Sequence, residues 1–160
     1  MKPKFPIIAI LVATLIGFAT PGASYVMPKG KDATAALIAS LIAGRTLIGE
    51  DSEAGTSAYF GPDGSFTSVG KDQIGLGKWY VQRNGTRMCH ITDWYTKYPG
   101  KPLEITKKLK NCWTFRVAED GGIWWAYFRS PEWYPFPARQ FRKGDIHKSK
   151  RAKMRKKLGV

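Results

Sequence analysis

The sequence predicts a mainly β domain, an antiparallel meander that forms a small barrel or sandwich, preceded by one short helix. Two observations carry this prediction. After residue 44 the chain divides into short runs of alternating apolar and polar residues, a pattern that favours strands. These runs are separated by turn sequences of defined chemistry, which are Pro62-Asp63-Gly64, Asn84-Gly85 and Glu119-Asp120-Gly121-Gly122.

The first 24 residues have the pattern of a signal peptide. Lys2 and Lys4 precede an almost wholly apolar run from Phe5 to Ala19, and small residues follow as far as Ser24. This run is shorter than the roughly 20 apolar residues that a membrane-spanning helix needs. We therefore expect cleavage near Ser24, a linker over residues 25–31, and a mature protein that is periplasmic or secreted, without a transmembrane span.

A short helix is expected directly after this linker. Asp32 is a candidate N-cap, the segment Ala33–Ala43 is rich in Ala, Leu and Ile, and Gly44 is a stop signal. The larger apolar residues of this segment share one helical face, which we expect to pack on the sheet; they are Leu37, Ile38, Leu41 and Ile42.

The remaining elements are strands within one domain that spans residues 32–145. In chain order we expect them at Arg45–Gly49, Ser57–Phe60, Ser65–Val69, Lys78–Gln82, Thr86–Thr92, Asn111–Ala118, Ile123–Phe128 and Ala138–Lys143. The stretch from Trp94 to Lys110 is expected to be a long loop. Side chains alternate between the two faces of a strand, so Trp113, Phe115 and Val117 should share the inner face.

The two cysteines, Cys89 and Cys112, are expected to form a disulfide, because exported proteins reside in an oxidising compartment. If Arg87 and Arg116 face solvent, alternation places both cysteines on the same outer side of the sheet. A metal pair or a redox pair is the alternative, but a CxxC spacing is missing from the sequence. We predict neither a metal nor a cofactor.

Several motifs, in their order and spacing, make the chain resemble a group of small exported proteobacterial proteins catalogued as domain of unknown function 995. The resemblance covers Ala33 to Asp145 and implies a calycin-like β-fold in the periplasm, with no established catalytic residues. The motifs that carry it are Leu41-Ile42-Ala43-Gly44-Arg45-Thr46-Leu47, Tyr59-Phe60-Gly61-Pro62-Asp63-Gly64, Gly77-Lys78-Trp79, Cys89, Cys112-Trp113 and Lys143-Gly144-Asp145.

Inward-facing side chains form a candidate ligand pocket, although the same residues could equally fill a solid core. They are Trp79, Met88, His90, Trp113 and Phe115. His90 is the one histidine of the predicted domain, so it is the candidate base of a catalytic triad. The sequence lacks a GxSxG motif, however, and we predict no catalytic residue.

A second aromatic group is expected near the end of the domain. Trp124 and Trp125 are adjacent, so they must point to opposite faces of their strand. With Trp133, Tyr134 and Phe136 they are a candidate exposed aromatic surface, which would suit a carbohydrate, a lipid or a protein partner.

The last residues, 146–160, are predicted to be a solvated basic tail without an apolar face. From residue 139 to the end there are ten Lys and Arg residues and one acid, whereas residues 25–138 are nearly balanced. This distribution argues against a nucleic-acid-binding body and favours adhesion of the tail to a polyanion such as anionic lipid headgroups or lipopolysaccharide. The expected contact residues are Lys148, Lys150, Arg151, Lys153, Arg155, Lys156 and Lys157.

Taken as a whole, the sequence favours a non-enzymatic periplasmic binding or envelope-associated module whose partner is an anionic envelope surface or a periplasmic protein. An inhibitor of an envelope hydrolase, similar to lysozyme inhibitors, is the alternative, although the basic charge of the chain counts against it. An enzyme with a site at the mouth of the barrel is a third interpretation.

Overall fold

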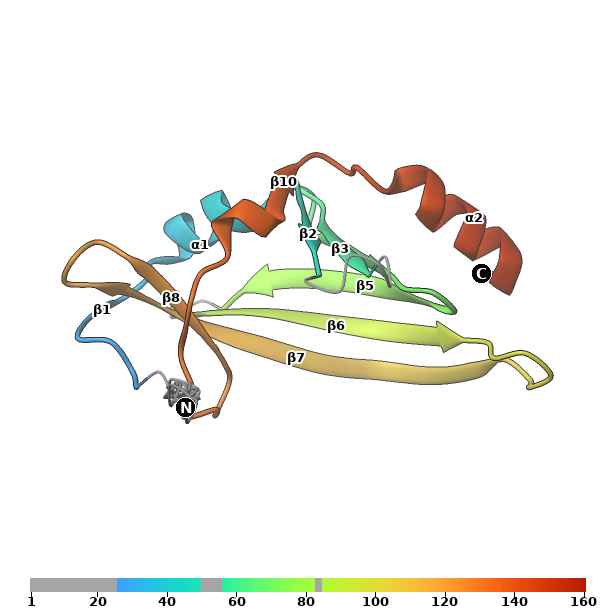
Figure 1. Cartoon of the computed structure of the whole chain (residues 1–160), viewed down its shortest axis with the longest axis horizontal. Helices are drawn as coiled ribbons and strands as arrows, with labels where there is room; N and C mark the ends of the chain where they lie inside the picture. The colour runs from blue at the N-terminus through green and yellow to red at the C-terminus, as the bar shows by residue number, and fades with distance from the viewer. Residues whose placement is uncertain (1–25, 50–55, 83–84) are drawn as a thin grey trace, which may run out of the picture.

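A single antiparallel sheet curls into a half-barrel that forms the body of the molecule (Figure 1). The computed structural model describes residues 26–49, 56–82 and 85–160. Within these ranges the strands follow the order β10-β2-β3-β4-β5-β6-β7-β8-β9, and β1 pairs with β7 beside this path. The mainly β fold and the antiparallel meander that the sequence predicts are therefore confirmed. The predicted signal peptide lies outside the described residues.

The elements have the following bounds in chain order: β1 Gly30–Asp32, α1 Ala35–Ile42, β2 Arg45–Ile48, β3 Ser57–Phe60, β4 Ser65–Val69, β5 Gln73–Val81, β6 Arg87–Thr96, β7 Glu104–Ala118, β8 Ile123–Tyr127, β9 Tyr134–Pro135, η2 Ala138–Gln140, β10 Phe141–Lys143 and α2 Lys148–Leu158. Among the described residues, no helix is both long and apolar enough to cross a membrane.

Helix α1 fills one face of the half-barrel. Ile38 and Ile42 are fully buried there, in a cluster with aromatic side chains of the sheet. The predicted N-cap was wrong by two residues: Thr34 caps the helix by accepting a hydrogen bond from the amide of Leu37 at 3.2 Å. Asp32 is instead the last residue of β1, an extended segment that the sequence suggested was only a linker.

The turn at residues 61–64 shows how the sequence sets the register of the meander. Gly64 adopts a positive φ of 81°, the left-handed conformation that favours glycine. The Asp63 carboxylate accepts hydrogen bonds from the Ser65 amide at 3.0 Å and the Ser65 hydroxyl at 2.6 Å, and these bonds lower its pKa. The resulting hairpin pairs Phe60 with Phe66. In the predicted turn at 84–85, Asn84 lies outside the described residues.

Strands β5, β6 and β7 are much longer than predicted, and the expected loop from Trp94 to Lys110 was wrong. Strand β6 continues to Thr96 and β7 begins at Glu104, so most of that stretch belongs to one long hairpin. A bulge between Thr92 and Trp94 shifts the register of β6 and β7. It interrupts the alternation of apolar and polar residues by which a strand is recognised in the sequence. Among the described strands, β8 pairs only with residues 113–117 of β7. The first half of β7 is therefore an edge of the sheet, where polar residues are favoured.

The predicted last strand, Ala138–Lys143, is also divided. Residues 138–140 form the short helix η2, and only Phe141–Lys143 forms a strand, β10. This strand pairs with β2 and places Phe141 opposite Leu47, so it ends the sheet on the side opposite β9. Pro137 directly precedes η2, and its fixed φ suits the first residue of a helical turn better than a central strand.

The prediction of a solvated tail without an apolar face was wrong. Residues 148–158 form helix α2, which packs on β4 and β5. Its buried residues recur at helical spacing, and two of them, Met154 and Leu158, form a second apolar cluster with Val69 and Ile74. In Figure 1, α2 lies near the beginning of β5, whereas α1 lies near its end. The two apolar positions were hidden in the sequence by the seven bases around them.

The two helices cover opposite faces of the sheet. Trp79 packs in the cluster of α1 and Ile74 in the cluster of α2. The two residues are five positions apart on β5, and side chains an odd number of positions apart point to opposite faces of a strand. The sheet is therefore covered on both sides where β4 and β5 meet the helices. This double cover explains why residues on both faces of β4 are buried.

Arg151 anchors α2 through its charge as well as through its burial. It forms an ion pair with Asp145 and donates a hydrogen bond to the Ser57 hydroxyl at 3.3 Å, with its guanidinium 5.6 Å from the centre of the Tyr59 ring. His147 also contacts the Ser57 hydroxyl, at 2.8 Å. Burial lowers the pKa of Arg151 to about 10, so the side chain remains protonated at neutral pH.

We predict that Met154→Ala destabilises the protein, because it removes a buried side chain from the contact between α2 and the sheet. The expected loss is about 2 kcal/mol in the free energy of unfolding, measured by urea denaturation. Lys156→Ala on the exposed face of the same helix is the matched control and should change this free energy by less than about 0.5 kcal/mol. Equal stability of both variants and the wild type would show that the packing of Met154 against the sheet does not stabilise the fold.

Candidate functional site

The predicted disulfide joins Cys89 and Cys112, which face each other directly across β6 and β7 with their Cα atoms 4.0 Å apart. Both lie on the face opposite Trp113, as predicted, although they are buried and not solvent-exposed. The bond closes a loop with a sequence separation of 23 residues. In the chain-entropy treatment, a loop of this size corresponds to a stabilisation of about 3 kcal/mol. The disulfide therefore ties together the two longest strands.

The interior of the half-barrel is a packed core and not an open cavity. Trp79, Met88 and Phe115, all predicted as pocket residues, belong to the buried cluster that α1 completes. The Trp79 indole also donates a hydrogen bond to the Gly61 carbonyl at 2.8 Å, so its polar atom is satisfied. A role in ligand binding for these three residues stays a prediction, whereas their packing against α1 is evident.

His90 lies within this interior, between two aromatic rings. Its ring stacks on Phe66 with centroids 4.1 Å apart and an interplanar angle of 10°, and on Trp113 at 5.4 Å. Its Nδ1 contacts the Thr92 hydroxyl at 2.6 Å. Burial lowers the pKa of His90 to about 4, so the ring is neutral at physiological pH. None of the hydrogen bonds and ion pairs of the described residues joins it to a carboxylate, which a triad base requires.

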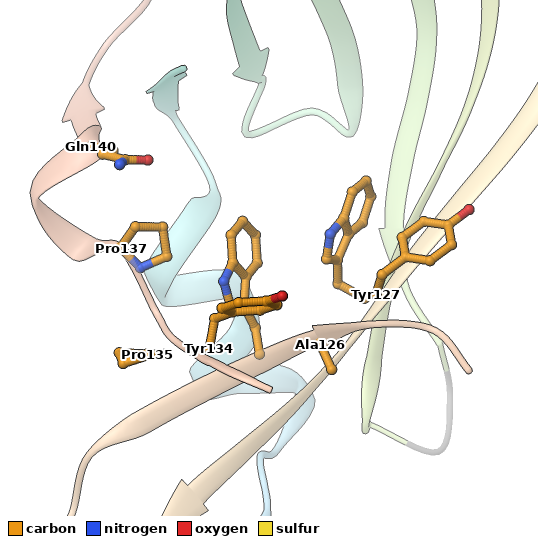
Figure 2. A pocket seen from close by; sticks show the side chains of 8 residues that line it. Ala126, Tyr127, Tyr134, Pro135, Pro137 and Gln140 are labelled. Carbon is orange, nitrogen blue, oxygen red and sulfur yellow. The ribbon is translucent and has the colours of Figure 1, made fainter. Parts of the chain in front are cut away.

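An aromatic cleft opens at the rim of the half-barrel, where the chain runs from β8 into β9 and η2. Its volume is about 330 Å³. Figure 2 shows Tyr127 at one end of the lining and Pro137 and Gln140 at the other, with Tyr134 between them. The lining residues come from β7, β8, β9 and η2 with its preceding proline; they are Trp113, Trp125, Ala126, Tyr127, Tyr134, Pro135, Pro137 and Gln140.

Strand pairing brings these aromatic residues together. Trp113 lies opposite Tyr127 across β7 and β8, and Trp125 lies opposite Tyr134 across β8 and β9. The Trp113 and Trp125 rings are nearly parallel, with centroids 6.2 Å apart and an angle of 22°, and the Tyr127 ring is perpendicular to Trp113. Phe136 packs edge-on against Trp125 from behind. The arrangement is held by backbone pairing and ring packing, which makes the cleft a preformed site.

Polar groups stand at the margin of the cleft. The Tyr127 hydroxyl donates to the Asn111 amide oxygen at 2.9 Å, and the Tyr134 hydroxyl donates to the Glu132 carboxylate at 2.5 Å. The Glu132 carboxylate also raises the pKa of Tyr134. The Tyr127 hydroxyl oxygen keeps a lone pair that can accept a hydrogen bond from a ligand. The cleft therefore combines aromatic faces with a few hydrogen-bonding groups, as small-molecule sites do.

The sequence identified part of this cleft. Trp113 was predicted as a pocket residue, and Tyr134 as part of an exposed aromatic surface; Tyr134 is 44% exposed. Trp133 was expected on the same surface but is buried. Gln140 was missed because it was assigned to the strand Ala138–Lys143, and Pro137 was missed because nothing in the sequence indicates that η2 lies beside β8.

Because α2 packs on the sheet, the predicted polyanion-binding residues differ in their exposure to solvent. Arg151 is buried and serves the ion pair with Asp145. Lys150 is half-buried. The other five residues are exposed; they are Lys148, Lys153, Arg155, Lys156 and Lys157, of which the last forms an ion pair with Asp72 at 3.3 Å. Binding of a polyanion by this exposed set stays a prediction.

These features define a class of protein: a β half-barrel whose interior is filled by a helix and whose candidate ligand site lies at the rim. Among the described residues, no three His, Cys, Asp or Glu side chains are grouped as a metal site would require. The chain belongs to the family described as protein of unknown function DUF995, which it matches over residues 9–155. This match confirms the resemblance and extends past residue 145 into α2. No curated protein and no solved structure matches the chain.

We predict a pH dependence of stability that depends on His90. Below its ordinary pKa of 6.5 the ring takes up a proton in the unfolded chain, whereas the folded protein resists protonation down to about pH 4. Stability should therefore be complete above pH 6.5 and fall as the pH decreases towards 4, by up to about 3 kcal/mol from this residue. Urea denaturation at several pH values measures the free energy of unfolding.

The variant His90→Gln removes this titration and should flatten the curve between pH 6.5 and 4. The matched control is His147→Gln, which keeps His90 and should keep the slope. Direct NMR titration of the His90 ring protons provides a readout that does not depend on the variant folding. A measured pKa near 6.5 for His90 would contradict the prediction.

Proposed function

We propose that this protein is a non-enzymatic binding module of the cell envelope that holds a short saccharide in the aromatic cleft. The observation that carries the proposal is the geometry of Trp113, Trp125, Tyr127 and Tyr134 around a cleft of about 330 Å³. Sugar rings present apolar C–H faces and polar edges, so they suit aromatic faces bordered by hydroxyl and amide groups. The volume is at the small end of the range for small-molecule sites, which suits one or two sugar rings.

The packed interior supports a site at the rim. A lipid carrier of the barrel type holds its ligand inside the barrel, but here Ile38 and Ile42 of α1 occupy that space together with Phe115. An acyl chain in the rim cleft would also lie beside polar groups at the margin, among them the Tyr127 hydroxyl and the Asn111 amide, with which it cannot form hydrogen bonds. A saccharide has hydroxyl groups that can pair with such groups.

The proposed envelope location is supported by two independent features. The first 24 residues have the charge and hydropathy pattern of an export signal. The paired Cys89 and Cys112 fit an oxidising compartment such as the periplasm, since cytosolic proteins rarely keep disulfides. Export is tested directly by fractionation of the native host and mass determination of the mature protein, which should lack residues 1–24 and two thiol hydrogens.

We predict that a neutral disaccharide perturbs the NMR signals of Trp113 and Trp125 on binding. The probes are the disaccharide of N-acetylglucosamine, cellobiose and maltose. Titration followed by NMR should shift the indole signals, and Tyr134→Ala should weaken binding at least about tenfold by removing one stacking face. Tyr134 is exposed, so this substitution should leave the fold intact.

The matched control for that experiment is Tyr98→Ala, at a tyrosine that is similarly exposed but lies in the turn between β6 and β7. It should bind like the wild type. A proline-rich peptide is the competing ligand for an aromatic groove and belongs in the same titration. Binding of the peptide with no response to any saccharide would overturn the saccharide assignment.

The exposed face of α2 provides a further contact with the envelope in this proposal. Lys153 and Lys156 project from this helix on the side away from the buried Met154. We predict that the double variant Lys153→Gln and Lys156→Gln lowers retention on vesicles that contain anionic lipid, because each basic residue near such a surface contributes about 1 kcal/mol. Physiological salt should weaken the effect in the wild type.

Co-sedimentation with anionic vesicles measures this retention, and vesicles of neutral lipid are the baseline. The control pair is Lys97→Gln with Lys101→Gln, which removes the same charge from the turn between β6 and β7. Equal loss of retention in both double variants would assign the attraction to net charge and not to α2.

The inhibitor hypothesis remains the second candidate, because the hairpin of β6 and β7 projects beyond the rest of the sheet (Figure 1). An inhibitor needs such a protruding segment to enter the cleft of an enzyme, and Tyr98 is exposed at its tip. Inhibition of a lysozyme that is lost in Tyr98→Ala and retained in Tyr134→Ala would favour this candidate over saccharide binding.

A further inference from the structure

A second pocket, of about 380 Å³, lies on the face of the sheet that carries the disulfide. Its lining includes three basic side chains, Arg87 of β6, Lys110 of β7 and Arg129 just after β8, together with Gln82. We refer to it as the basic pocket. Tyr127 lines both the basic pocket and the aromatic cleft, but the two sites lie on opposite faces of the sheet, because Cys112 and Trp113 are adjacent residues of β7.

The basic side chains of this pocket are held close together by one ring. The guanidinium of Arg87 lies 3.9 Å from the centre of the Phe128 ring, and the guanidinium of Arg129 lies 5.2 Å from the same ring. Phe128 is fixed in turn by a backbone hydrogen bond from its amide to the Cys112 carbonyl at 2.8 Å. The positions of the two positive charges are therefore set by the strand that the disulfide anchors.

None of the acidic side chains that the structure describes forms an ion pair with the basic pocket. The ion pairs of the described residues join Arg116 to Asp32, Arg151 to Asp145 and Lys157 to Asp72, and none of them includes a residue of this pocket. In addition, the Nε of Arg87 is shielded from solvent and has no hydrogen-bond acceptor among the described residues. A shielded donor without an acceptor is unfavourable unless a ligand supplies one.

Like charges that gather around one ring repel each other. An anion bound between them adds an attraction to each charge and makes the total electrostatic energy of the group favourable. Guanidinium groups pair well with carboxylate and phosphate, because their planar donors match two oxygen atoms at once. Lys110 adds a third donor, 6.0 Å from the Tyr80 ring. The set is thus suited to a single small anionic group.

We propose that the basic pocket binds the carboxylate or phosphate group of an acidic saccharide, at a second site on the face of the sheet opposite the aromatic cleft. The inference rests on the proposed function for the class of ligand and adds a site that selects its charge. The Tyr127 ring lies beside Trp113 in the cleft, whereas Phe128, the next residue, lies beside Arg87 in the basic pocket. An acidic saccharide bound on this face would place its acidic substituent among Arg87, Lys110 and Arg129.

The test compares saccharides that share a ring and differ in charge. N-acetylglucosamine is neutral, N-acetylmuramic acid carries a carboxylate, and N-acetylglucosamine 6-phosphate carries a phosphate. At constant ionic strength, one of the acidic sugars should bind at least about tenfold more tightly than the neutral one, as expected for a hydrogen bond to a charged group. The two acidic sugars distinguish a carboxylate site from a phosphate site.

The variants Lys110→Gln and Arg129→Gln should abolish this preference and leave the affinity for N-acetylglucosamine unchanged. Both residues are exposed, and a thermal melt of each variant checks that the fold is retained. Lys97→Gln with Lys101→Gln, in the turn between β6 and β7, is the charge-matched control and should keep the preference. An equal preference in the wild type and in Arg129→Gln would overturn the assignment of the anion to this pocket.

Two further outcomes separate this inference from the proposed function. If neutral and acidic sugars bind equally well, the aromatic cleft is a saccharide site and the inference fails. If no sugar binds, the proposed function fails. Titration with inorganic phosphate then tests separately whether the basic pocket binds an anion. Shifts of the Arg87 and Arg129 side-chain signals with phosphate would support an anion site there, and their absence would overturn it.

Discussion

The packing of α1 into the half-barrel is the constraint on which the rest of the structure depends. Ile38 and Ile42 are completely buried among the aromatic side chains of the sheet, so side chains fill the space that α1 covers. The aromatic cleft and the basic pocket open elsewhere, one beside β9 and η2 and the other beside the disulfide.

A series of rings connects the core to the rim. Phe66, His90, Trp113 and Trp125 stack one after another, with centroid distances of 4.1, 5.4 and 6.2 Å. A neutral imidazole fits this series because burial disfavours its charged form. The first rings of the series stabilise the fold and the last form the wall of the aromatic cleft. Substitutions in the core are therefore expected to alter the cleft as well, and exposed residues such as Tyr134 are better probes of binding.

The sequence predicted the elements whose signals are local. The turn at Pro62-Asp63-Gly64, the burial of Ile38 and Ile42 in α1, and the pairing of Cys89 with Cys112 all depend on short-range chemistry or on compartment, and all are present in the structure. The match to the DUF995 family agrees with the order of motifs along the chain.

Features that depend on a distant partner were missed. Met154 and Leu158 are two apolar residues in a basic segment, and only Val69 and Ile74 on the sheet give them a surface to pack on. The polar outer half of β7 forms a strand because β6 pairs with it, and a bulge conceals its alternation. The aromatic cleft was recognised through its tryptophans and tyrosines, whereas Gln140 depends on how η2 crosses the rim.

The position of β10 and α2 at the end of the chain has a consequence for folding during synthesis. Strand β10 pairs with β2, and it places Phe141 opposite Leu47, nearly a hundred residues earlier in the chain. A nascent chain that has emerged as far as β9 therefore still lacks the strand that pairs with β2, and Val69 and Ile74 are not yet covered by α2. The nascent chain should remain open to chaperones and to transport machinery until β10 and α2 have emerged, and the native state should form only after that point.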